Sequence, residues 1–143
     1  HAVGDSKWAE DRIGSERIQD AYAWQNILKS GVRLLLNSDL PGEPWKPMET
    51  LYFAVNRKPL DSTKESKGWY MNQALTVEEA LKAMTIENAY GAFQEKKLGS
   101  IEVNKLADFI IIDQNPLTVV SEDIKNIKVL ETWVSGIKVN SIN

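Results

Sequence analysis

Apolar residues recur at helical spacing near the start of the chain and predict a helix over residues 15–29. Ser15 is placed to cap the helix, and Ser30-Gly31 ends it. One face carries four apolar residues, Ile18, Ala21, Tyr22 and Leu28. A short turn then leads into an apolar strand, so helix and strand are expected to be antiparallel neighbours.

A continuous apolar run, Val32 to Leu36, predicts a buried parallel strand, which breaks into Asn37-Ser38-Asp39-Leu40-Pro41. Asp39 is therefore expected at the carboxyl end of this strand. Ligands and catalytic groups gather at that edge in open α/β sheets and barrels. By spacing alone, a turn or helix cap is the commoner role for such an Asp.

The middle of the chain predicts helices separated by polar loops. Met48 to Val55 forms a short helix, and residues 56–68 form a polar loop that is either a lid or a solvated connector. Thr76 and Glu79 make a capping box that starts a helix ending near Met84. Thr85 is placed to cap the next helix, which ends before Gly99.

From Gly99 onward the pattern changes to strands. Residues 100–102 and 108–113 are strand-like, and residues 128–134 and 137–139 flank Ser135-Gly136 as a hairpin. The sequence therefore predicts a helix-rich α/β part followed by a small β lobe.

Composition limits the function without identifying it. The 143 residues are 43% hydrophobic and carry a net charge of -3, with a pI near 5.2 and no basic stripe. This argues against nucleic acid or an anionic membrane as the main partner. There is no Cys, and no apolar stretch approaches the length of a membrane span or signal peptide. A cytoplasmic location is the expectation.

Many short motifs occur along nearly the whole chain in a distinctive order and spacing. They are His1-Ala-Val-Gly-Asp5, Trp8, Gly14-Ser-Glu-Arg17, Ala21-Tyr22-Ala-Trp24, Gly31-Val32, Asn37-Ser38-Asp39-Leu40-Pro41, Gly68-Trp69-Tyr70, Leu75-Thr76, Glu79-Ala80, Thr85, Gly99-Ser100, Lys105-Leu106-Ala107-Asp108 and Asn115-Pro116-Leu117. In this order and spacing they resemble the carboxyl-terminal quarter of the metal-dependent amidohydrolases. The resemblance is closest to amidohydrolase family 3, the YtcJ-like subgroup.

The resemblance implies the end of a (β/α)₈ TIM barrel. Residues 1–98 would run from the end of strand seven to the region of helix eight, one or two β/α units. Residues 99–143 would be strands of a composite β-sandwich domain. A complete barrel takes about 250 residues, so the chain is expected to hold an incomplete one, and its start to be an artificial boundary, a processing point or a cut.

The resemblance also implies the chemistry. These enzymes bind one or two divalent ions, commonly zinc, through several histidines, a bridging group and the strand-eight Asp, which Asp39 resembles. Asp39 is thus the candidate metal ligand and general base for hydrolysis of amides or cyclic amides by metal-activated water. The chain has one His and no His-x-His pair. Three protein ligands is the usual minimum for catalytic zinc, so no tightly bound metal is expected on this chain alone.

Four further residues are candidates for substrate binding. His1 resembles the family's histidine after strand seven, and is otherwise a tag remnant or a solvated terminal residue. Trp45 and Trp69, with Tyr70, either line the pocket mouth or pack locally in a loop. The acidic pair Glu78-Glu79 is explained by helix capping.

The sequence departs from the family pattern at two turns. Asn37 replaces a glycine before Ser38-Asp39, and Asn tolerates unusual backbone angles well. Val103-Asn104 replaces a Pro-Gly turn, where Asn can occupy the left-handed position of a type II turn and leave a hairpin intact.

Two functions remain open. The chain is either part of an amidohydrolase, inactive without the other barrel strands, or a truncated, non-catalytic folded or oligomerising module. An upstream reading frame that continues into a His-x-His motif would favour the enzyme. The expected partners are a small-molecule substrate and either the rest of the barrel or another copy of the chain, because exposed strand edges and apolar faces need covering.

Overall fold

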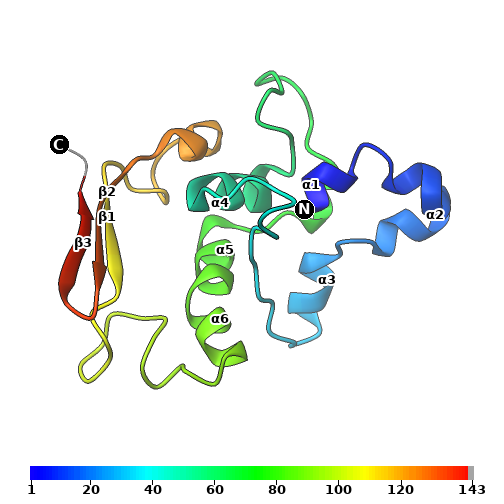
Figure 1. The fold of residues 1–143 in the computed structure, drawn as a ribbon. Helices are drawn as coiled ribbons and strands as arrows, with labels where there is room; N and C mark the ends of the chain where they lie inside the picture. Colours follow the sequence, from blue (N-terminus) through cyan, green and yellow to red (C-terminus); the bar gives the residue numbers. More distant parts are fainter. Residues whose placement is uncertain (142–143) are drawn as a thin grey trace.

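Helices fill the first two thirds of the chain, and a small sheet lies at one end of the molecule (Figure 1). The structure is a computed structural model and describes residues 1–141. The helical elements are α1 (Ala2–Asp5), α2 (Ala9–Arg17), η1 (Ile18–Asp20), α3 (Trp24–Lys29), α4 (Pro47–Asn56), η2 (Met71–Gln73), α5 (Val77–Met84), α6 (Ile86–Gly91) and η3 (Ser121–Asn126). The strands are β1 (Phe109–Ile112), β2 (Val129–Val134) and β3 (Ile137–Ser141).

The single helix predicted over residues 15–29 is wrong, because the structure breaks it between η1 and α3. Ala21 is extended, and Tyr22 has a positive φ of 51°. Apolar periodicity suited one helix, but contacts from distant residues hold Tyr22 outside helical geometry. The predicted ends of this helix agree better with the structure. Gly14 interrupts α2 just before residue 15, with a φ of 82°, and Ser30-Gly31 follows α3.

The predicted buried strand over residues 32–36 is an extended segment without a strand partner among residues 1–141. Leu34 and Leu36 are each 9% exposed, whereas Val32 is 59% and Leu35 41% exposed. Only one face of the segment is therefore buried. The Leu36 amide donates to the Ala83 carbonyl at 3.1 Å, and the Asn88 side chain donates to the Leu36 carbonyl at 2.8 Å. The segment is held by α5 and α6 in place of neighbouring strands.

Helix α4 is the centre of the hydrophobic core. The predicted helix over residues 48–55 is confirmed, with Pro47 in its first turn, where a missing N–H costs nothing. Leu51 and Tyr52 are fully buried. The core joins α4 to the extended segment, α5 and η3, and its buried members are Leu34, Leu36, Met48, Leu51, Tyr52, Ala54, Leu75, Ala80, Ala83, Ile124 and Ile127.

The capping box that starts α5 is confirmed. The Glu79 amide donates to the Thr76 hydroxyl at 3.2 Å, and the Thr76 amide donates to the Glu79 carboxylate at 2.8 Å. This second bond is the largest cause that lowers the pKa of Glu79. Thr85 precedes α6 as predicted but does not cap it, because its hydroxyl donates back to the Leu81 carbonyl at 2.7 Å.

The sheet is antiparallel with the order β1-β2-β3. Phe109 pairs with Trp133 across β1 and β2, and their rings stack at 5.5 Å. The hairpin of β2 and β3 is confirmed, whereas the strand predicted at residues 100–102 is not formed. Asn104 does take the predicted left-handed position, with a φ of 72°, and the Lys105 amide donates to the Glu102 carbonyl at 3.1 Å. The turn exists, but no hairpin is built on it.

The polar loop at residues 56–68 is anchored by a buried lysine. Lys58 is 4% exposed, and its Nζ lies 2.5 Å from a Glu122 carboxylate oxygen in η3. The same Nζ donates to the carbonyls of Thr63, Lys64 and Ser66 at 3.2–3.3 Å. These bonds join the loop to η3 through the Lys58 side chain. The choice between a lid and a connector stays a prediction.

The α/β expectation is confirmed at the level of helices with a small antiparallel sheet. Within the described residues, no helix has the length and apolar character needed to span a membrane.

Replacing Lys58 tests the anchor. Lys58→Met should lower the free energy of unfolding by about 3 kcal/mol, because it leaves the Glu122 carboxylate partly buried without its cation. The matched control is Lys138→Met. Lys138 pairs with Glu131 at 2.9 Å but is 44% exposed in its side chain, so the expected loss is below about 1 kcal/mol. Urea denaturation of the chain measures both, and equal losses would contradict a special role for Lys58.

Candidate functional site

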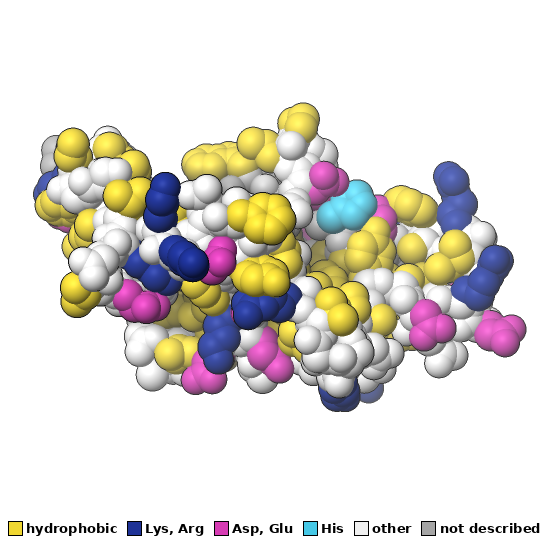
Figure 2. Space-filling view, turned by 90° about the horizontal axis from the view of Figure 1, so that it is seen from below, with side chains coloured by type: hydrophobic (Ala, Val, Ile, Leu, Met, Phe, Trp, Pro, Cys, Tyr) yellow, Lys and Arg dark blue, Asp and Glu magenta, His cyan; other side chains and the backbone are white. Residues whose placement is uncertain are grey.

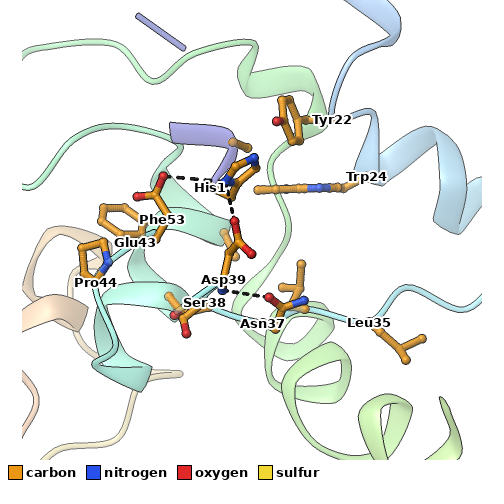
Figure 3. Close-up of a pocket in the computed structure, with 14 residues that line it drawn as sticks. His1, Tyr22, Trp24, Leu35, Asn37, Ser38, Asp39, Glu43, Pro44 and Phe53 are labelled. Carbon is orange, nitrogen blue, oxygen red and sulfur yellow. Dashed lines mark hydrogen bonds and ion pairs between the residues drawn. The ribbon is translucent and has the colours of Figure 1, made fainter. Parts of the chain in front are cut away.

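A cavity of about 360 Å³ lies where the extended segment, α1, α3 and α4 meet (Figure 3). Both polar and apolar side chains line it. The lining residues are His1, Ala2, Tyr22, Trp24, Leu35, Leu36, Asn37, Ser38, Asp39, Glu43, Pro44, Thr50, Phe53 and Ala54. Of the five residues proposed from the sequence, the cavity brings together His1 and Asp39.

Asp39 follows the extended segment in a tight polar turn. Its φ is 58°, in the left-handed region, where Asp is tolerated better than most residues. The Asp39 amide donates to the Asn37 side-chain oxygen at 2.8 Å, and the Gly42 amide donates to the Asp39 carbonyl at 2.8 Å. Asn37 therefore stabilises the turn through its side chain. More than half of the Asp39 side chain, 57%, stays exposed to the cavity and solvent.

His1 lies between carboxylates. Its Nδ1 is 2.9 Å from Asp39 Oδ2 and 3.8 Å from a Glu43 oxygen, and its Nε2 is 3.3 Å from Asp5 Oδ2. The imidazole thus bridges Asp39 and Asp5, which lies four residues further along at the end of α1. In the space-filling view the single imidazole lies next to acidic side chains and beside a hydrophobic surface (Figure 2).

Tyr22 extends this chain of polar contacts by one residue. Its hydroxyl donates to the Asp5 carboxylate, and its ring meets the His1 ring edge to face at 6.1 Å. Burial of the phenol raises the pKa of Tyr22 well above its usual value, and the nearby Asp5, Asp39 and Glu43 raise it further. The phenol therefore stays a hydrogen-bond donor at neutral pH, and it orients Asp5 toward His1.

Apolar side chains also line the cavity. Trp24, Leu35 and Phe53 are among them, and Figure 3 shows Trp24 reaching toward His1 and Phe53 beside Glu43. Sequence reasoning did not assign Tyr22, Trp24, Asp5 or Glu43 to the site. The spacing of His1 and Asp5, four residues apart on one helical turn, was an available signal. The position of Trp24 in the site could not be predicted from the sequence, because it depends on the break in the helix after η1.

The other sequence candidates lie elsewhere. Trp45 is 67% exposed and does not line the cavity. Trp69 packs against Tyr22 and Tyr70 at ring distances of 5.9 and 5.3 Å, behind the cavity wall. Contact of Trp45 or Trp69 with substrate stays a prediction.

The described residues do not form a metal site by themselves. Among residues 1–141, no group of three or more His, Asp or Glu side chains is arranged to hold a metal ion. The His1–Asp39 separation of 2.9 Å is that of a hydrogen bond. Asp39 alone falls short of the three protein ligands usual for catalytic zinc.

Comparison with known protein families assigns the sequence to one of them. The profile described as "Amidohydrolase family" matches residues 1–139. The chain therefore belongs to the amidohydrolase family, and the resemblance carried by its motifs is confirmed.

The chain is also similar to individual proteins and to a solved structure. The chain is 34% identical to Protein LONG AFTER FAR-RED 3 of Arabidopsis thaliana over 95% of its length, and 31% identical to the putative amidohydrolase YtcJ of Bacillus subtilis over 94%. It is 30% identical to N-substituted formamide deformylase of Arthrobacter pascens over 79%. It spans 23%, 25% and 20% of these proteins. An amidohydrolase from Thermotoga maritima has a similar fold, with a TM-score of 0.63 and 21% identity over 85% of this chain and 26% of that one.

Replacing Asp5 tests the contacts behind His1. Asp5→Asn should lower the pKa of Tyr22 toward its usual value, because the carboxylate that favours the protonated phenol is gone. Tyr52 is the internal control, since burial and Glu122 raise its pKa to about 12 without Asp5. NMR of the chain labelled with carbon-13 at tyrosine Cζ resolves the individual phenols during an alkaline titration and measures both.

The raised pKa of Tyr22 also makes the stability of the fold depend on pH. A raised pKa in the folded state stabilises the fold below the usual phenol pKa, and this contribution is lost as pH rises through the folded value. Asp5→Asn should therefore reduce the loss of stability on alkaline titration. An unchanged Tyr22 titration would contradict the Asp5 contact.

Proposed function

We propose that this chain forms part of the active site of a hydrolase that cleaves carbon–nitrogen bonds in amides or cyclic amides. The proposal depends on the position of Asp39. This residue follows the extended segment at residues 32–36 and lines the cavity, its side chain is more than half exposed, and its carboxylate contacts the His1 imidazole. Membership of the amidohydrolase family supports it, as does the relative named N-substituted formamide deformylase.

Asp39 is the general base of this proposal. A water attacks the carbonyl carbon of the substrate and passes one proton to the Asp39 carboxylate. The proton then moves to the nitrogen as the C–N bond breaks, so that the products are an amine and a carboxylic acid. His1 contacts Asp39 through Nδ1 at 2.9 Å and orients the carboxylate. Asp5 contacts the other imidazole nitrogen of His1, and the Tyr22 hydroxyl donates to Asp5.

A divalent metal, zinc in the usual family chemistry, would lower the pKa of the attacking water. Because the described residues do not make a metal site alone, Asp39 is proposed as one ligand of a site whose other ligands lie outside them. The chain by itself is proposed to be inactive. It would supply the strand-eight Asp and part of the substrate wall of a barrel that is completed by further sequence.

The partner of the chain is proposed to be the remainder of such a barrel, or a second copy of the chain. Large apolar side chains on several elements are exposed, as the space-filling view shows for one face (Figure 2). Examples are Phe93 at 89%, Val103 at 90% and Ile137 at 68%. Light scattering tests this, since a clean monomer of 16.1 kDa with sharp cooperative unfolding would argue against it.

Asp39→Asn in the whole protein that carries this chain tests the proposed role. The variant should lose bound metal and slow amide hydrolysis by at least about a hundredfold, because base and ligand are removed together. Metal content by elemental analysis and turnover of a panel of N-acyl compounds are the measurements. Asp61→Asn is the control, since Asp61 is exposed in the polar loop. Retained metal and activity in Asp39→Asn would sink the proposal.

A further inference from the structure

Arg57 is the least exposed charged residue of the described chain, and it takes no part in the polar contacts around Asp39. It has 0% exposure, follows α4 directly and adopts the left-handed conformation, with a φ of 48°. It does not line the cavity. No carboxylate pairs with it among the contacts of residues 1–141.

The Arg57 guanidinium lies between two indole rings. Its carbon is 4.4 Å from the centre of the Trp24 ring and 5.2 Å from that of Trp69. Its Nε donates to the Trp69 carbonyl at 2.6 Å, and its Nη1 donates to the Tyr22 carbonyl at 3.3 Å. Burial lowers the pKa of Arg57 to about 10, so the side chain is still a cation at neutral pH.

Each of these contacts acts on the aromatic side of the cavity. Tyr22 and Trp24 line the cavity, and Trp69 packs against the Tyr22 ring at 5.9 Å. Tyr22 has a positive φ, which costs energy in a residue of this size. The bond from Arg57 to the Tyr22 carbonyl stabilises that conformation. Trp24 begins the next helix, so its place in the wall depends on the same break.

A buried cation without a carboxylate partner is a costly way to fill a core. An apolar side chain of equal length would pack there at lower cost. Arg is suited to the position for another reason: its planar fork donates to two carbonyls while its face stacks on a ring, which Lys cannot do. These contacts suit a role in which Arg57 fixes the orientation of the aromatic residues around it.

We propose that Arg57 is a positioning residue of the cavity, which holds Tyr22 and Trp24 as a rigid wall for a flat, apolar group of the substrate. The class of group follows from the flat indole of Trp24 and from the other apolar side chains that line the cavity, Leu35 and Phe53. The identification of the bound molecule as a substrate rests on the function proposed above. The positioning of Tyr22 and Trp24 by Arg57 does not rest on that function, and a separate experiment tests it.

The first test uses the indole N–H signals in NMR spectra of the full chain, which has five tryptophans. Arg57→Lys should shift the signals of Trp24 and Trp69 and leave those of Trp8, Trp45 and Trp133 in place. Arg33→Lys is the matched control, since Arg33 stacks on Tyr90 at 4.0 Å and is 51% exposed in its side chain. A folded Arg57→Lys chain with unchanged Trp24 and Trp69 signals would overturn the proposal, whatever the enzymatic function.

The second test is a double-mutant cycle in the whole protein, with substrates that differ only in having an aromatic or a methyl group on the acyl side. Arg57→Lys should raise KM for the aromatic substrate about tenfold and change kcat by less than about twofold. Trp24→Leu should do the same, and the double variant should be no worse than Trp24→Leu, because Arg57 acts through that ring. Additive effects, or equal losses for both substrates, would refute positioning through Trp24. Failure of the Asp39→Asn prediction would refute the proposed base and leave this comparison intact.

Discussion

The turn that ends α4 buries two consecutive cations, Arg57 and Lys58. Their side chains contact segments that lie far apart in the sequence. Arg57 reaches the carbonyls of Tyr22 and Trp69 and the ring of Trp24. Lys58 reaches Glu122 and three carbonyls of the polar loop. A left-handed residue at this position is usually glycine. Here it is Arg57, which ends the helix and sends two adjacent charged side chains into different parts of the structure.

This constraint explains how a chain with so little sheet can define a cavity. α4 is the centre of the core, and its buried face holds the extended segment that leads to Asp39. At its end, Arg57 contacts Tyr22 and Trp24, which line the cavity, while His1 contacts Asp39 and Asp5. The cavity therefore depends on tertiary contacts between residues far apart in sequence.

The sequence was most informative where local interactions decide the structure. The capping box of Thr76 and Glu79, the helix over 48–55 and the hairpin around Ser135-Gly136 all depend on residues close in sequence, and all are confirmed. The motifs around Asp39 also led to the right family. The domain boundary near residue 98 and the barrel interpretation stay predictions.

The sequence was least informative where distant contacts overrule local preference. The helix over 15–29 breaks because Arg57 and Asp5 hold Tyr22 out of helical geometry. The segment at residues 32–36 is not a strand, because a strand needs a neighbouring strand to bond with its backbone. Here α5 and α6 make the hydrogen bonds to Leu36. For the same reason Trp24 could not be assigned to the site from the sequence. Asp5 was missed although its spacing from His1 was an available signal, whereas Asp39 and His1 were proposed from the family resemblance.

The central claim is that Asp39 belongs to a metal-dependent hydrolytic site that further sequence completes. A crystal structure of the whole protein grown with zinc, with anomalous diffraction recorded at the zinc edge, tests it most directly. We expect a zinc ion whose distance to an Asp39 carboxylate oxygen is about 2.0–2.2 Å, with histidines from outside the present chain as its other ligands. Zinc bound elsewhere, with Asp39 paired only to His1, would contradict the claim.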